Sequence, residues 1–86
     1  MSPEASAAAA SHHTLDRLVY MANQIAGFFE SQGGGTAGED TATHLRRYWE
    51  PRMRAAIIAH LEAGGAGLDD TARAAVARLG QRAKAG

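Results

Sequence analysis

The chain contains no cysteine, so disulfide bonds, iron–sulfur ligation and thiolate zinc sites are excluded. Its nine basic residues are balanced by nine acidic residues, which argues against a protein built mainly to coat nucleic acid. No apolar run approaches the roughly 18 residues needed to span a membrane. The N-terminal residues lack the basic and apolar regions of a secretory signal. Segments of alternating hydrophobicity are also missing, so we predict no β-strand.

Motifs for catalysis and cofactor binding are absent as well. No serine or cysteine nucleophile stands in a sharp-turn pattern, and no carboxylate pair lies in an apolar context. The glycines of residues 31–39 lack a preceding strand and a following Gly-Lys-Ser/Thr, so they match no phosphate loop. His12 and His13 are adjacent, and His44 and His60 fall on different predicted helices, so no spaced set of metal ligands is formed. We therefore expect no catalytic residue, no cofactor-binding residue, no metal ligand and no enzymatic activity in this chain.

Apolar residues recur at helical spacing along most of the 86 residues, which predicts an all-α fold in one domain over residues 14–82. We expect a small bundle of about four short helices over residues 15–30, 40–49, 51–63 and 70–82. A flexible glycine-rich linker follows the first helix over residues 31–39. Residues 1–13 are small, polar and aperiodic, which predicts a disordered tail, and residues 83–86 are expected to fray.

Local signals mark the ends of the predicted helices. Pro51 fits the first turn of the third helix, where its missing N–H would have no partner anyway. Gly64 and Gly65 end that helix, because glycine readily adopts the left-handed conformation found just past a C-terminus. The residues expected to cap the other helices are Thr14 for the first, Asp40 or Thr41 for the second, and Asp69 for the fourth.

The first helix carries an apolar arc wider than one neighbouring helix would cover, because Met21 and Phe28 flank its main stripe. Asn23 and Gln24 follow the edge of that arc. Two interpretations of these amides stay open: ordinary surface polarity, or hydrogen bonds across an interface with another protein. The main stripe consists of Leu15, Leu18, Val19, Ala22, Ile25, Ala26 and Phe29.

The fourth helix has a shallow, alanine-rich apolar face marked by Ala72, Val76 and Leu79, so we expect it to dock weakly. A core of this size seldom contributes more than about 3–5 kcal/mol. Without partners, the chain is therefore expected to be helical but loosely packed, or to self-associate through exposed apolar surface.

Trp49, the only tryptophan, stands at the corner between the second and third helices. Leu45, Tyr48 and Trp49 share one helical face by their spacing. Two interpretations stay open here as well. Trp49 either fills the core of the bundle or anchors a protein interface, since tryptophan and arginine are enriched among binding hot spots. The arginines around this corner are Arg46, Arg47, Arg52 and Arg54.

Arg52 and Arg54 fall in the first turn of the third helix, where the positive end of the helix dipole disfavours cations. Helix stability therefore does not explain them. We hypothesise that both arginines dock on an acidic or carbonyl-rich surface of a partner, because charged donors form strong, directional hydrogen bonds at interfaces.

Two sequence blocks carry a resemblance to a known family. LVYMANQIAGFF, residues 18–29, and HLRRYWEPRMRAAIIAHLEAGGAGLD, residues 44–69, resemble the delta subunit of soluble NAD-dependent molybdenum formate dehydrogenases. Within them, MANQIA and WEPRMR are the most specific parts. The chain departs from the family pattern at Glu50, where aspartate is more usual, and in its more flexible linker.

The resemblance implies a cytoplasmic complex of alpha, beta, gamma and delta subunits that oxidises formate to carbon dioxide and reduces NAD. It implies bis-molybdopterin guanine dinucleotide in the alpha subunit, with iron–sulfur clusters and FMN also in partner subunits and no cofactor in the delta chain. The implied role is assembly, stabilisation or cofactor maturation of the catalytic alpha subunit. From residue type and motif position, the expected partner-contacting residues are Asn23, Gln24, Trp49, Arg52 and Arg54.

A different class of function stays open as the alternative. The arginines near Trp49 would allow a small helical nucleic-acid-binding or regulatory module. A steep salt dependence of DNA binding would distinguish that module from a protein-binding subunit, because each neutralised phosphate releases counterions. The balanced charge of the chain favours the subunit, with no nucleic acid and no membrane among its partners.

Overall fold

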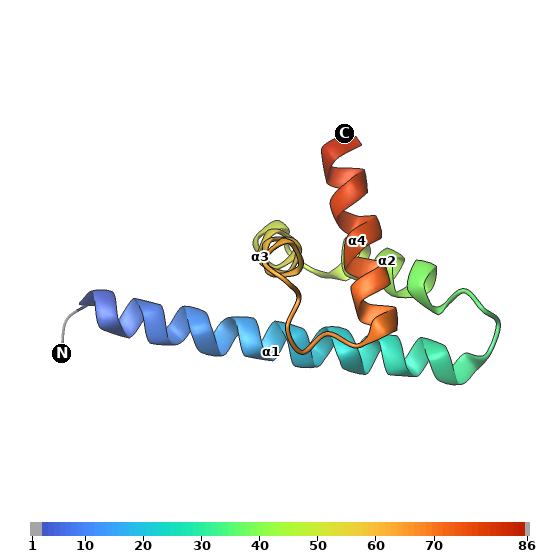
Figure 1. The fold of residues 1–86 in the computed structure, drawn as a ribbon, viewed down its shortest axis with the longest axis horizontal. Coiled ribbons are helices and arrows are strands. Elements are labelled where there is room, and N and C mark those ends of the chain that lie inside the picture. The colour runs from blue at the N-terminus through green and yellow to red at the C-terminus, as the bar shows by residue number, and fades with distance from the viewer. Residues whose placement is uncertain (1–2, 86) are drawn as a thin grey trace.

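The structure, a computed structural model, describes the backbone of residues 3–85 and the side chains of residues 14–83. It contains four helices and, within residues 3–85, no strand, which confirms the predicted all-α bundle (Figure 1). None of these helices combines the length and the apolarity that crossing a membrane requires. The helices are α1 Pro3–Gln32, α2 Ala37–Tyr48, α3 Pro51–Glu62 and α4 Asp70–Ala85.

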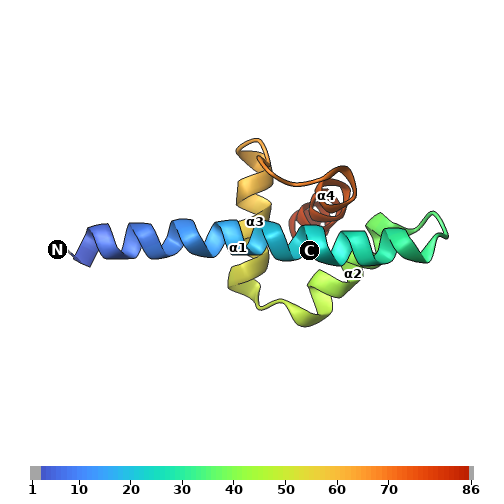
Figure 2. The same ribbon diagram turned by 90° about the horizontal axis from the view of Figure 1, so that it is seen from below.

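Helix α1 forms a long rod, and the other three helices gather against its C-terminal part (Figure 1). Seen from below, α3 crosses α1 steeply and α2 lies near the C-terminal end of α1 (Figure 2). The N-terminal turns of α1, drawn in blue, extend beyond the other helices in both views. The packed part of the protein is therefore built on the second half of α1.

Helix α1 begins earlier than the sequence predicts. The predicted helix over residues 15–30 lies within α1, but Thr14 is inside the helix and is not its N-cap, so that prediction is wrong. The alanine run of residues 7–10 explains the difference, because alanine has the highest helix propensity and nothing before Thr14 stops the helix. No side chain of residues 1–13 is described, and disorder of that tail in solution stays a prediction, as does fraying of residues 83–86.

Helix α2 also begins earlier than predicted, at Ala37, so neither Asp40 nor Thr41 is its N-cap. Thr36 occupies the N-cap position and its hydroxyl donates to the Asp40 carboxylate at 2.9 Å. Asp40 thus lies in the first turn, where its charge suits the helix dipole. The connection from α1 is correspondingly short, and Gly33 turns it with a φ of 72°.

The predicted boundaries of α3 are confirmed. Pro51 is at its first position, and the chain after Glu62 forms a Schellman motif. The Gly64 N–H donates to the Leu61 carbonyl at 2.9 Å, and the Gly65 N–H donates to the His60 carbonyl at 2.8 Å. Both glycines have positive φ, 122° and 68°, which side chains disfavour.

Polar contacts fix the connection between α3 and α4. The Arg73 guanidinium donates to the carbonyls of Gly64 and Gly65 at 3.1 and 3.0 Å. Asp69 caps α4 as predicted, since its carboxylate accepts the Ala72 N–H at 2.8 Å. The loop therefore holds the start of α4 in a defined place.

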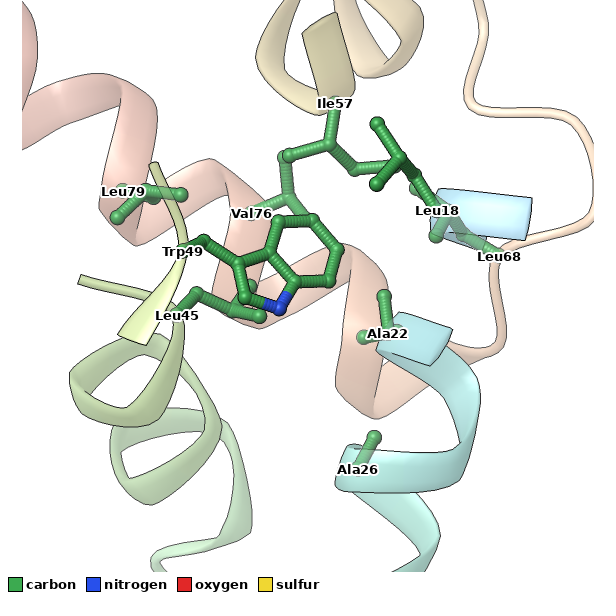
Figure 3. Packing of buried hydrophobic residues seen from close by; sticks show 10 residues of the cluster. Leu18, Ala22, Ala26, Leu45, Trp49, Ile57, Leu68, Val76 and Leu79 are labelled. Atoms are coloured by element: carbon green, nitrogen blue, oxygen red, sulfur yellow. The ribbon is translucent and has the colours of Figure 1, made fainter. Parts of the chain in front are cut away.

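Helix α4 is the central helix of the bundle and packs on α1, α2 and α3. The expectation of a weakly docked helix does not fit this packing, because small residues let α4 approach three neighbours closely. Gly80, for example, is buried, and a Cβ there would lie 3.4 Å from Ile58. The apolar core around α4 (Figure 3) consists of Leu18, Ala22, Ala26, Leu45, Trp49, Ile57, Leu68, Ala72, Val76 and Leu79.

Candidate protein-binding surface

The five residues predicted to contact a partner separate into two groups in the structure. Asn23, Trp49 and Arg54 hold parts of the chain together, whereas Gln24 and Arg52 are exposed. Their contact with a partner stays a prediction for all five residues. The structure nevertheless shows which of them are free to make such a contact without disturbing the fold.

Trp49 lies in the core, with 5% of its surface exposed. Its indole ring packs near Leu45 and Val76 (Figure 3). Trp49 ends α2 with an extended backbone, φ −87° and ψ 141°, while its N–H still donates to the Leu45 carbonyl. Of the two interpretations of this corner, the chain by itself adopts the one in which Trp49 fills the bundle.

Asn23 joins α1 to the loop that precedes α4. Its Nδ2 donates to the Gly67 carbonyl at 2.8 Å, and its Oδ1 accepts the Asp69 N–H at 2.9 Å. Both ends of the amide therefore have intramolecular partners. This part of the MANQIA block has a structural explanation, and only Gln24 leaves an exposed amide there.

Arg54 closes the C-terminal end of α2. Its Nη1 donates to the carbonyl oxygens of Trp49 and Arg46, the latter at 3.3 Å. These carbonyls carry the negative end of the α2 dipole, which attracts a cation. The inference that stability does not explain this arginine is therefore wrong for Arg54. Arg52 is exposed and makes no hydrogen bond or ion pair that the structure records with residues 14–83.

Aromatic side chains line up on the outer surface where α1 and α2 meet. Phe28 and Tyr48 are 59% and 69% exposed, although phenylalanine is among the residues most often buried. Ring centroids lie 5.2 Å apart for Phe28 and Phe29, 6.2 Å for Phe29 and His44, and 4.7 Å for His44 and Tyr48. We call this row, together with Ile25, the aromatic face.

Two shallow depressions of about 370 and 290 Å³ lie side by side along the aromatic face, with Phe29 and His44 in both. Gln24 borders the first depression, and Asp40 and Arg47 border the second. Exposed aromatic rings with a polar rim are typical of a protein-binding surface.

The sequence indicated only half of this surface. The wide apolar arc of the first helix points to Phe28, but the sequence spacing predicts that Tyr48 shares a face with Leu45 and Trp49. In the structure Tyr48 points outward while Leu45 and Trp49 are buried, so that prediction is wrong for Tyr48. Around the helix axis, Tyr48 and Trp49 lie on opposite sides of Leu45, so they face different surroundings. Helix α1 does not cover the side that carries Tyr48.

The side chains of the aromatic face are mainly aromatic and apolar. Among the side chains of residues 14–83, no group of three or more histidine, aspartate and glutamate residues could hold a metal ion. The chemistry available on this face is apolar and aromatic contact, with amide and charged groups at its edge.

The family model described as the NADH-dependent formate dehydrogenase delta subunit, FdsD, matches residues 17–76. The chain belongs to this family. The match spans more than two thirds of the 86 residues and includes every member of the aromatic face. No curated protein and no solved structure matches the chain. Membership of the FdsD family confirms the resemblance, and the family description implies association with other formate dehydrogenase subunits.

Proposed function

We propose that this chain is a non-catalytic accessory subunit of a cytoplasmic NAD-dependent formate dehydrogenase complex, and that it docks on another subunit through the aromatic face. The observation that carries the proposal is the row of rings from Phe28 to Tyr48, both of them exposed, in a member of the FdsD family. A subunit needs a surface that recognises its complex, and this row holds two of the three large hydrophobic side chains that are exposed among residues 14–83.

The physical argument rests on the cost of leaving these rings in water. Burying apolar surface contributes roughly 25 cal/mol per Å², and an aromatic side chain presents about 150–250 Å². Phe28 and Tyr48 together therefore supply several kcal/mol when a partner covers them, enough to act as interface anchors. Asp40 and Arg47 at the rim would orient the partner by charge.

We assign the catalytic alpha subunit as the partner of the aromatic face. In this proposal, bis-molybdopterin guanine dinucleotide, the iron–sulfur clusters and FMN belong to the partner subunits, and this chain holds none of them. Its cysteine-free sequence supplies no thiolate for a cluster. The accessory role is assembly, stability or cofactor maturation of the alpha subunit.

The test is co-purification from cells that produce this chain with the alpha, beta and gamma subunits. The double variant Phe28→Ser and Tyr48→Ser removes two exposed rings and leaves the core intact. We expect recovery with the alpha subunit to fall about tenfold or more, since two interface anchors are lost. The isolated variant should retain wild-type helicity, measured by circular dichroism.

Tyr20→Ser is the matched control. Tyr20 is 63% exposed on α1 and lines neither depression of the aromatic face. This variant should co-purify like the wild type. Equal recovery of the double variant and the wild type would contradict docking through the aromatic face, and absence of the wild-type chain from the complex would contradict the accessory role itself.

A further inference from the structure

A second surface lies on the other side of α2, between α2, α3 and α4. It consists of two adjoining depressions of about 440 and 330 Å³, and Arg46 and Arg82 border both. Thr43 separates this surface from the aromatic face, since it borders a depression of each. We call the two depressions together the arginine groove. The other residues that line it include Glu39, Arg54, Arg78, Ile58 and Leu79.

Positive charge is concentrated in the arginine groove although the whole chain is formally neutral. Arg46, Arg54, Arg78 and Arg82 line the groove, and Glu39 is the only acidic residue among the residues that line it. The groove therefore has an excess of positive charge. Its arginines come from three helices and from positions that are far apart in the sequence.

The arginines of the groove keep hydrogen-bond donors available. A guanidinium has five N–H donors. Within the described side chains, Arg46 uses one on the Thr43 hydroxyl at 3.3 Å, and Arg82 has no recorded bond. Arg54 covers the C-terminal carbonyls of α2, which would otherwise repel an anion.

A carboxylate already occupies one end of the groove. Glu39 accepts a hydrogen bond from Arg78 at 3.3 Å, and both side chains are more than half exposed. The pair shows that the groove accepts a carboxylate beside a guanidinium, while its exposure makes the pair weak. The carboxylates of a bound segment would accept hydrogen bonds from the guanidinium groups of Arg46 and Arg82, as Glu39 does from Arg78.

The floor of the second depression is aliphatic. Ala55, Ile58 and Leu79 line it beside Arg54 and Arg82. Nucleic acid presents mainly phosphate charge to a basic surface and gains little from such a floor. An acidic polypeptide segment with an aliphatic side chain matches both the arginines and the aliphatic floor of the groove.

We propose that the arginine groove binds an acidic polypeptide segment whose carboxylates pair with Arg46 and Arg82 and whose aliphatic side chain packs on Ala55 and Ile58. The groove is a second interaction surface, distinct from the aromatic face. The chain can therefore contact two polypeptide segments at once, on the two sides of α2.

The test measures fluorescence anisotropy of a short labelled peptide that repeats glutamate, leucine, glutamate and serine, titrated with the full chain. We expect saturable binding that weakens with added salt, because the pairing is electrostatic. The peptide with glutamine in place of glutamate should bind about tenfold more weakly, as should the one with serine in place of leucine. A labelled thymidine oligonucleotide of similar length is the comparison for nucleic acid.

Two double variants with equal change in charge locate the binding. Arg46→Gln with Arg82→Gln should weaken binding of the acidic peptide about tenfold or more. Arg17→Gln with Arg52→Gln, two exposed arginines outside both the groove and the aromatic face, should leave it unchanged. Circular dichroism establishes that each variant remains helical.

Three results would overturn the proposal: no saturable binding of the acidic peptide, equal loss in both double variants, or tighter binding of the oligonucleotide than of the peptide. The titration uses this chain alone and needs no formate dehydrogenase subunit. Its failure is therefore distinguishable from failure of the aromatic face to support co-purification.

Discussion

The buried corner around Trp49 and the aromatic face lie one residue apart in sequence and have opposite relations to solvent. Trp49 is 5% exposed and Tyr48 is 69% exposed. The same split separates Asn23, which bonds to the loop before α4, from exposed Gln24. Each pair has one member that stabilises the fold and one that is available to a partner.

The geometry of a helix explains this split. Consecutive residues are rotated by about 100° around the axis, so neighbours in sequence face different surroundings. A motif such as MANQIA or WEPRMR thus combines structural and surface positions. Residue type alone does not distinguish them, because tryptophan, asparagine and arginine can stabilise a fold as well as bind a partner.

The largest expected effect separates Trp49 from Tyr48. Trp49→Ala should lower the free energy of unfolding by about 3–5 kcal/mol, because it leaves a large cavity among Leu45, Ile57 and Val76. Tyr48→Ala should change it by less than about 0.5 kcal/mol, as is usual for exposed side chains. Urea unfolding of the isolated chain, followed by circular dichroism, tests both. The loss at Trp49 is about as large as the whole contribution of a core of this size, so that variant should show no cooperative transition, whereas the Tyr48 variant should keep the wild-type midpoint. Similar losses in the two variants would contradict the distinction between the buried corner and the aromatic face.

A smaller effect is expected between the two amides of α1. Asn23→Ala removes the hydrogen bonds to Gly67 and Asp69 and should cost about 1–2 kcal/mol, since water can replace part of what is lost at this exposed loop. Gln24→Ala should be nearly neutral for stability. Hydrogen exchange of the Asp69 amide should accelerate in the Asn23 variant only. Unchanged exchange there would show that Asn23 does not hold the loop.

The smallest expected effect separates Arg54 from Arg52. Arg54→Gln should destabilise the chain by about 1 kcal/mol, because the loss of the cap on α2 is partly offset by removal of a cation from the first turn of α3. Arg52→Gln removes only the unfavourable cation and should be neutral or slightly stabilising. Thermal melting of the two single variants, compared at low salt, measures the difference. If the Arg54 variant is more stable than the wild type, Arg54 does not cap α2, and partner docking becomes the explanation for this arginine.

Some features of the fold were readable in the residues themselves because they depend on local chemistry. Pro51 begins α3, Gly64 and Gly65 end it, and Asp69 caps α4, each through contacts within a few residues. The predicted starts of α1 and α2 are wrong because other local signals compete with the caps. Alanine propensity extends α1 to residues before Thr14, and Thr36 takes the N-cap position ahead of Asp40. The loose packing expected of the isolated chain stays a prediction.

The amino-acid sequence by itself determined an all-α chain of four helices, the limits of α3, the start of α4 and membership of the FdsD family. Helical periodicity and capping are properties of neighbouring residues, so they can be read without knowing what packs against them. Only the tertiary structure decided that Trp49 faces α4, that Tyr48 joins Phe28 on the outside, and that Arg46 and Arg82 border one groove. Those outcomes depend on how α1, α2, α3 and α4 cross, and crossing is set by side chains that are distant in the sequence.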